Sequence, residues 1–408
     1  MRNLWKKKAL TKNSTILSSE SHEMPPRVVI YKGTYQYGAV NLFADEIAEG
    51  FRKLGRETVF VDLTDTSALQ SNLSKAFSGS NVEFILSFNA AGYCFELNAK
   101  SLYDSLPFPF FAFLVDHPAH HLDRLRFNNI IISAMDRSHV HFLNNYFKGS
   151  KKVFFMPHGG CRSSLAGTPR EKKIDVLFPA SYMDMDEELT KIKSLEPFSQ
   201  KLIYDSVDII LKNDAIPIED ALETIGRGLG INIYEGKIFY KMASEIINKI
   251  ETLVRAIKRT EMLKILDDAG IAVDIYGNGW PENRFKSHRV HKALPFNEIN
   301  DLMTESRIVI NAANIADGAH ERVFTTMLNG SLCLSDYNPY LAETFREDSE
   351  IVFYRWTKIT GMPDIITKLL ADNELLENIS LNGAAVASAS HKWEHRAAQL
   401  IKIVEESK

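Results

Sequence analysis

Short apolar runs that alternate with helix-like segments constrain the fold of this chain more than any other feature. Arg27–Gly33 (RVVIYKG) is a β-branched run that ends in a glycine, and Asn41–Leu54 then carries apolar residues at helical spacing. Continuous apolar runs of this length are typical of buried parallel strands. Similar runs follow at 57–63, 82–89, 110–116, 129–134 and 152–157. The alternation predicts a doubly wound parallel sheet over residues 27–160.

The same pattern starts again in the second half of the chain. An apolar run at 172–181 is followed by a long stretch, 184–262, that has helical spacing and no strand signal. Strand-like runs resume at 273–277, 289–294, 307–313, 331–336 and 350–354. We therefore expect an α/β fold in which two Rossmann-like domains face each other across a cleft. The second domain is predicted at 161–383 with a helical insertion at 184–262, and a final helical segment at 384–408.

Composition excludes several classes of protein. The 408 residues suit two or three domains, and the net charge of -4 gives no reason to expect a nucleic-acid partner. Cys94, Cys161 and Cys333 are far apart and form no CxxC pair, which predicts reduced thiols in the cytoplasm and no zinc site.

The first 26 residues are basic and polar. No apolar stretch follows the basic residues of Met1–Asn13, so we expect no secretory signal there. No run approaches the ~18 apolar residues that span a membrane. We expect a flexible tail, and a weak contact of its basic residues with the inner face of a membrane is the alternative.

Loops at the carboxyl ends of parallel strands are where ligands bind in such sheets. The segment Tyr31–Gly38 (YKGTYQYG) follows the first strand and places Tyr37 and Gly38 at such an end. Its backbone amides would approach an anion there, and a plain strand-to-helix turn is the alternative. His158, in Met156–Gly160 (MPHGG), either lines the cleft or fills the turn beside glycines that suit a hinge.

Val115–His121 (VDHPAHH) offers a general base. Asp116 and His117 stand together where a strand ends, a position from which a carboxylate or imidazole reaches an acceptor hydroxyl in the cleft. A turn held by their hydrogen bonds is the alternative. A metal site is the weaker alternative, because the histidines have no regular ligand spacing.

Two stretches of the second domain predict a donor site. In Tyr276–Trp280 (YGNGW), Gly277 and Gly279 let the backbone approach a ligand beside Asn278, and Trp280 would cover a flat group, unless the stretch is a tight turn. In the loop Lys292–Pro295, the backbone of Ala293, Leu294 and Pro295 would pair with a nucleobase edge.

Asp317–Arg322 (DGAHER) precedes the helical run Val323–Asn329. Free amides and the dipole at a helix N-terminus favour a diphosphate, and Arg322 adds a charge-assisted contact. Glu321 would orient a hydroxyl or the arginine, with His320 beside it. A solvated capping cluster is the alternative.

In their order, the segments at 276–280, 294–311 and 320–354 (HERVFTTMLNGSLCLSDYNPYLAETFREDSEIVFY) resemble the C-terminal half of GT-B glycosyltransferases. They are most similar to the group named after the spore maturation protein CgeB. The resemblance is good over 270–380, architectural over 27–160 and absent over 184–262. It implies a nucleotide-sugar donor on the second domain and an acceptor on the first. It also implies that the helix at 384–408, with Trp393, packs back toward the first domain.

The resemblance further implies where the donor lies. The base would meet the loop Lys292–Pro295, and the phosphates would meet His320 and Arg322. Many relatives have a ribose-binding glutamate where this chain has Thr325, so either ribose binding would pass to Glu321 or Glu343, or the donor would not be a common UDP-sugar.

The function expected from this resemblance is metal-independent glycosyl transfer without a cofactor. The donor would be a UDP-sugar first, or a CMP-, GDP- or dTDP-sugar, and the acceptor a glycan, a lipid-linked glycan or a protein. A sugar-nucleotide epimerase and a non-catalytic binding scaffold are the alternatives. The helical insertion would shape the acceptor site or form a homodimer contact.

Overall fold

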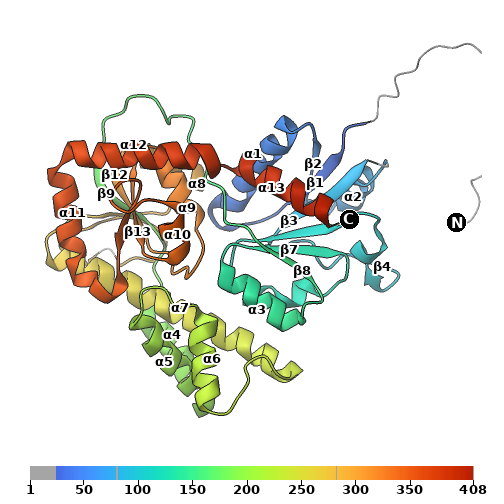
Figure 1. Cartoon of the computed structure of the whole chain (residues 1–408), viewed down its shortest axis with the longest axis horizontal. Helices are drawn as coiled ribbons and strands as arrows, with labels where there is room; N and C mark the ends of the chain where they lie inside the picture. Colours follow the sequence, from blue (N-terminus) through green and yellow to red (C-terminus); the bar gives the residue numbers. More distant parts are fainter. Residues whose placement is uncertain (1–23, 80, 282, 408) are drawn as a thin grey trace, which may run out of the picture.

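The computed structural model describes residues 24–79, 81–281 and 283–407. Two six-stranded sheets, a helical insertion and a crossing C-terminal helix make up this part of the chain (Figure 1). Residues 1–23 of the segment predicted as a basic tail lie outside the described residues. None of the described helices combines the length and the low polarity that a membrane crossing requires.

The first sheet has the strand order β2-β1-β3-β6-β7-β8, and all its neighbouring strands are parallel. Alternate residues of its central strands enter two separate hydrophobic cores, one on each face, which explains why most residues of these strands are apolar. The strands and helices of this domain are β1 (Arg27–Lys32), α1 (Ala39–Lys53), β2 (Glu57–Asp62), α2 (Leu69–Ala76), β3 (Val82–Phe88), β6 (Phe110–Leu114), β7 (Ile130–Ala134), α3 (Arg137–Phe147) and β8 (Lys152–Phe155). The sequence analysis did not predict the short hairpin of β4 (Glu96–Leu97) and β5 (Lys100–Ser101).

The second sheet repeats this arrangement with the order β11-β10-β9-β12-β13-β14, again parallel. Its strands are β9 (Ile174–Pro179), β10 (Asp274–Tyr276), β11 (Arg289–His291), β12 (Ser306–Asn311), β13 (Leu332–Asp336) and β14 (Val352–Tyr354). Its helices are α8 (Phe296–Thr304), α9 (Glu321–Leu328), α10 (Pro339–Thr344), α11 (Met362–Ala371) and α12 (Asn373–Ser390).

The insertion between β9 and β10 is a bundle of helices that lies below both domains in Figure 1. It consists of α4 (Met185–Lys193), α5 (Pro197–Leu211), α6 (Ile218–Gly228) and α7 (Lys237–Asp268). Its buried side chains form one continuous core with side chains of the first domain, among them Leu125 and Phe142. The insertion therefore belongs to the second domain in sequence but packs against the first.

The C-terminal segment is broken, whereas its apolar spacing suggested one continuous helix. Helix α12 ends at Ser390, and α13 (Trp393–Glu406) begins after a bend at which the carbonyl of His391 accepts a hydrogen bond of 2.7 Å from the Gly160 amide. Helix α13 then packs on α1 so closely that a Cβ atom on Gly50 would lie 2.7 Å from the Cα atom of Glu394. The last helix thus joins the second domain to the first.

Candidate functional site

A cavity of about 520 Å³ lies between the two domains, where strands of both sheets end. The predicted site residues that line it are Tyr37, Asp116, His158, Gly277, Ala293, Leu294, His320, Glu321 and Arg322. The predicted residues outside its lining are Gly38, His117, Asn278, Gly279, Trp280, Pro295 and Thr325. The fold therefore gathers residues from both halves of the sequence around one cleft.

The start of α9 differs from the expected cradle of free amides. The amide of Glu321 donates to Nδ1 of His158 at 3.0 Å, and the amide of Arg322 donates to Nδ1 of His320 at 3.3 Å. The Val323 amide donates to the carbonyl of His320. These amides already have acceptors within the protein, so the start of α9 does not present them as the free donors that the sequence suggested.

His158 lines the cleft and has a ring nitrogen for which the described residues offer no partner. Because its Nδ1 accepts from an amide, the neutral ring carries its proton on Nε2. The side chain is 2% exposed, and Nε2 is buried without a hydrogen-bond partner among the described residues. A ligand oxygen in the cavity would satisfy this donor.

Glu321 is a buried carboxylate between two imidazoles. Its carboxylate contacts His320 and lies 3.8 Å from Nδ1 of His158. Burial would raise the pKa of Glu321, but the charges of His320 and Arg322 outweigh burial and lower it well below its usual range. Glu321 therefore stays ionised beside the two rings.

Three guanidinium groups meet at the cleft, two of which the sequence analysis missed. Arg255 and Arg259 on α7 line the cavity together with Arg322. Arg255 pairs with Glu251, and Arg259 donates from Nη1 to the carbonyl of Ser181 at 2.8 Å. The Nε atoms of Arg255 and Arg259 are buried and have no hydrogen-bond partner within the described part of the chain.

These positive charges repel one another. Burial lowers the pKa of Arg259 well below its usual range, and the charges of Arg255 and Arg322 lower it further. A site that holds like charges together favours a ligand of opposite charge. The spacing of four residues between Arg255 and Arg259 on one helix was the available signal, because such residues share a face.

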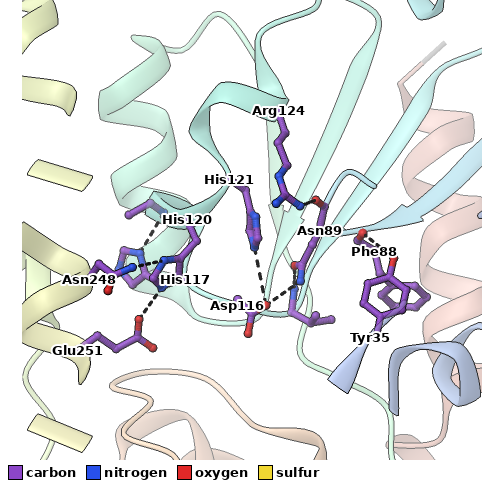
Figure 2. A network of polar contacts seen from close by, with 12 residues as sticks. Tyr35, Phe88, Asn89, Asp116, His117, His120, His121, Arg124, Asn248 and Glu251 are labelled. Carbon is purple, nitrogen blue, oxygen red and sulfur yellow. Dashed lines mark hydrogen bonds and ion pairs between the residues drawn. The ribbon is translucent and has the colours of Figure 1, made fainter. Parts of the chain in front are cut away.

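Asp116 reaches the cleft from the first domain (Figure 2). Its side chain is 60% exposed, and Oδ2 accepts a hydrogen bond of 2.7 Å from Nδ2 of Asn89. Desolvation of the carboxylate opposes ionisation, but the charge of His121, which lies 3.8 Å away, and the hydrogen bond from Asn89 lower the pKa of Asp116 below its usual value. The carboxylate is ionised and accessible, as a general base requires.

His117 points away from this cavity. Its Nδ1 accepts from the Ala119 amide at 3.1 Å, and its Nε2 lies 3.1 Å from Oε1 of Glu219 on α6. Burial lowers the pKa of His117, but the charge of Glu219 raises it more. Of the two predicted bases, only Asp116 faces the cleft.

Three other predicted contacts are made within the protein. Trp280 is buried and donates from Nε1 to the carbonyl of Ala180 at 2.6 Å, so it does not cover a group in the cleft. A Cβ atom on Gly277 would lie 2.1 Å from that same carbonyl oxygen, so the glycine allows two loops to approach each other. Thr325 is fully buried and accepts through Oγ1 from the Cys161 amide at 3.1 Å.

Tyr37 bridges the two domains at the cleft. Its hydroxyl lies 2.6 Å from Oγ of Ser181 and accepts from Nδ2 of Asn278 at 2.9 Å. An aromatic residue that the sequence analysis did not single out, Tyr276, also lines the cavity and stacks on His291, with ring centroids 4.3 Å apart. Together with Leu294, the Tyr276 side chain gives this end of the cavity an apolar wall.

A smaller cavity of about 100 Å³ continues toward the helical insertion. It shares Asp116, Arg255, Arg259 and Arg322 with the larger cavity, and it is also lined by residues of α6 and by Asp136. The insertion therefore closes one end of the cleft.

Comparisons with known proteins agree with this architecture. A family profile described as glycosyl transferase-like matches residues 251–402, which is less than half of the chain but includes Arg255, Arg259 and Arg322. No curated protein matches the sequence.

Among solved structures, sucrose-phosphate synthase from Thermosynechococcus elongatus is similar, with a TM-score of 0.53 and 9% identity over 93% of this chain and 98% of that one. An α-glucosyltransferase in complex with UDP-glucose and DNA containing an abasic site is also similar. Its TM-score is 0.53 and its identity 9%, over 93% of this chain and 99% of that one. These likenesses identify the fold as GT-B, as the sequence predicted.

Proposed function

We propose that this protein is a glycosyltransferase that uses a nucleoside diphosphate sugar as its donor. The observation that carries the proposal is the meeting of Arg255, Arg259 and Arg322 at one cavity between the two domains. The family profile over 251–402 and the UDP-glucose named with one similar structure support it.

The arginines favour a diphosphate over other anions. Guanidinium groups bind phosphate oxygens through charge-assisted, often bidentate hydrogen bonds. A donor with two phosphates offers more oxygens to three guanidinium groups than a CMP-sugar, which has one phosphate. We therefore place a UDP-, GDP- or dTDP-sugar before a CMP-sugar, with UDP first. The nucleobase would lie against Tyr276 and Leu294.

The residues that carry out the transfer lie on opposite walls of the cleft, with Asp116 on one side and the three arginines on the other. The acceptor oxygen attacks the anomeric carbon, the bond from that carbon to the diphosphate oxygen breaks, and Asp116 takes the hydroxyl proton. The three arginines stabilise the charge on the departing nucleoside diphosphate, and Nε2–H of His158 donates to a donor oxygen. This arrangement needs no metal ion for the leaving group, because fixed positive side chains supply the charge.

The acceptor is proposed to approach from the first domain, next to Asp116. A glycan, a lipid-linked glycan and a protein hydroxyl all offer the nucleophile that this mechanism needs. The order of segments in 320–354 is the reason to place the chain in the CgeB-like group of such enzymes.

The test is thermal stability with UDP, GDP, dTDP, ADP and CMP, for wild type, Arg259→Ala and Arg322→Ala. A ligand at ~100 times its Kd stabilises by about 2.7 kcal/mol. We expect a nucleoside diphosphate to raise the Tm of wild type, and each variant to bind it roughly ten- to hundredfold more weakly. Lys264→Ala is the matched control, because Lys264 is exposed on the same helix.

The nucleotide found in this way is then tested as a sugar donor. Release of free sugar or of a glycosylated acceptor, lost in Asp116→Asn, would support transfer. A rearranged sugar nucleotide without an acceptor would identify an epimerase instead. The absence of any nucleotide effect on the Tm of wild type would refute the donor site and leave a scaffold role.

A further inference from the structure

A second group of polar side chains lies between the first domain and the insertion, outside the donor site proposed above. His117 follows β6, His139 lies on α3, and Glu219 lies on α6. Their exposed fractions are 4%, 7% and 2%. One possible ligand atom of each residue lies within 4.8 Å of the others, and the two imidazole rings are 4.4 Å apart.

We propose that His117, His139 and Glu219 form a binding site for one divalent transition-metal ion of the Zn²⁺ type. Two imidazole nitrogens and one carboxylate oxygen are a ligand set that Zn²⁺ takes in proteins, with a fourth position open to water. All three side chains line the cavity of about 100 Å³, which provides room for that water.

His139 supplies the second observation behind the proposal. Its Nδ1 is buried and has no hydrogen-bond partner among the residues that the structure describes. Buried polar atoms are nearly always satisfied by protein, water or an ion. A ring nitrogen on α3 that lacks a partner among the described residues, next to a buried imidazole and a buried carboxylate, is explained by an ion that all three side chains share.

His117 shows what the ion would replace. With Nδ1 accepting from the Ala119 amide, the neutral ring donates its Nε2 proton toward Glu219. An ion bound at Nε2 takes the place of this proton, and the ring keeps one proton on Nδ1. The Ala119 amide then loses its acceptor, which affects only a three-residue 3-10 helix, Pro118–His120.

Charges of both signs surround the three ligands. Asp136 and Glu251 line the same cavity, and so do Arg255, Lys258, Arg259 and Arg322. Glu251 pairs with His120 and Arg255, so part of its charge is already balanced, and the oxygens of Asp136 accept backbone amides. The negative charge of Glu219 is thus the main attraction for the ion.

The ion would fix the insertion to the first domain. Glu219 is on α6, which packs against α7, and α7 carries Arg255 and Arg259. A bond from α6 to His117 and His139 therefore sets the position of these arginines relative to Asp116, the residue next to His117. The ion acts as a structural clamp and takes no part in the transfer step.

Metal binding by the tag-free full chain is the test. The protein is stripped with a chelator and titrated with Co²⁺, read by visible absorption, and with Zn²⁺, read by calorimetry and Tm. We expect one ion per chain, an absorption band of nitrogen- and oxygen-ligated Co²⁺, and a higher Tm with Zn²⁺. The absence of tight binding by wild type would overturn the proposal without touching the donor site.

Two variants and one control assign the ligands. His139→Ala and Glu219→Gln are expected to lose at least tenfold in affinity for Zn²⁺. His141→Ala is the matched control, since His141 lies on the same helix and is exposed. Equal affinity in His139→Ala, His141→Ala and wild type would also refute the site. Since wild-type binding is measured first, a variant that fails to fold does not decide the outcome.

Discussion

A Cβ atom on Gly318 would lie 2.0 Å from the carbonyl oxygen of Met135, which belongs to the other domain. The two backbone segments pair there. Asp136 and Gly318 form an isolated antiparallel bridge, and the Arg137 amide donates to the carbonyl of Asp317 at 3.0 Å. This contact holds the loop that precedes His320 against the first domain. The closed cleft depends on the absence of a side chain at position 318.

Gly318→Ala should therefore open the cleft without unfolding either domain. The methyl group forces the backbones apart, and a misplacement of about 1 Å in a catalytic site costs on the order of a hundredfold in rate. We expect kcat/KM for transfer to fall by that order. The matched control is Gly361→Ala, because a Cβ atom there meets nothing within 4 Å. Equal loss in both variants, or full activity of Gly318→Ala, would contradict the role of this contact.

Asp136→Asn tests the same joint through its hydrogen bonds. The Asp136 carboxylate is 1% exposed and accepts from the amides of Ser138, Ala316 and Asp317 at 2.8 to 2.9 Å. An asparagine turns its NH₂ group toward one or two of these donors, which leaves them unsatisfied. The free energy of unfolding should fall by roughly 2–4 kcal/mol, measured by urea denaturation. A change below that of the exposed Asp123→Asn would disprove the argument.

His158 has two nitrogens with separate tasks, and two substitutions separate them. His158→Asn places an oxygen near the position of Nδ1, which retains an acceptor for the Glu321 amide, but it removes the donor at Nε2. We expect near-normal stability and about tenfold weaker donor binding, the value of one charge-assisted hydrogen bond. His158→Gln should do the reverse, with a lower Tm. Identical effects of the two variants on Tm and Kd would refute this division.

The sheets were predictable because their signal is local. A strand such as Phe110–Leu114 is apolar at every position since both faces of the sheet are covered, and this pattern can be seen without knowing its neighbours. The break between Ser390 and Trp393 was not visible in the sequence. It depends on a backbone bond from Gly160, which is remote in the chain.

The cleft was harder to predict than the fold, because side-chain direction is decided by packing. Trp280 and Thr325 lie in segments next to the cleft, but their polar atoms bond to Ala180 and Cys161 inside the protein. Arg255 and Arg259 lie on α7, the last helix of the insertion, and nothing in the sequence shows how this helix docks. Sequence order identified the loops of the site and Arg322, but not the other two arginines that line the cleft.

The pH dependence of stability gives a test of how α13 is joined to α1. Glu394 forms ion pairs with Lys392 and with Lys53 of α1, and these lysines, Lys392 first, lower the pKa of Glu394 to about 2. A carboxyl whose pKa is lower in the folded state stabilises above its unfolded pKa, about 4.5, and this contribution is lost as the pH falls toward 2.

Glu394→Gln should therefore lower the Tm at pH 7, and the difference from wild type should shrink below pH 4.5. The pair is partly exposed, so the effect at pH 7 is at most about 1 kcal/mol. Thermal unfolding from pH 7 to pH 3 measures it, with Glu374→Gln on α12 as the exposed control. A difference that stays constant down to pH 3 would mean that Glu394 stabilises the joint by packing and not by charge.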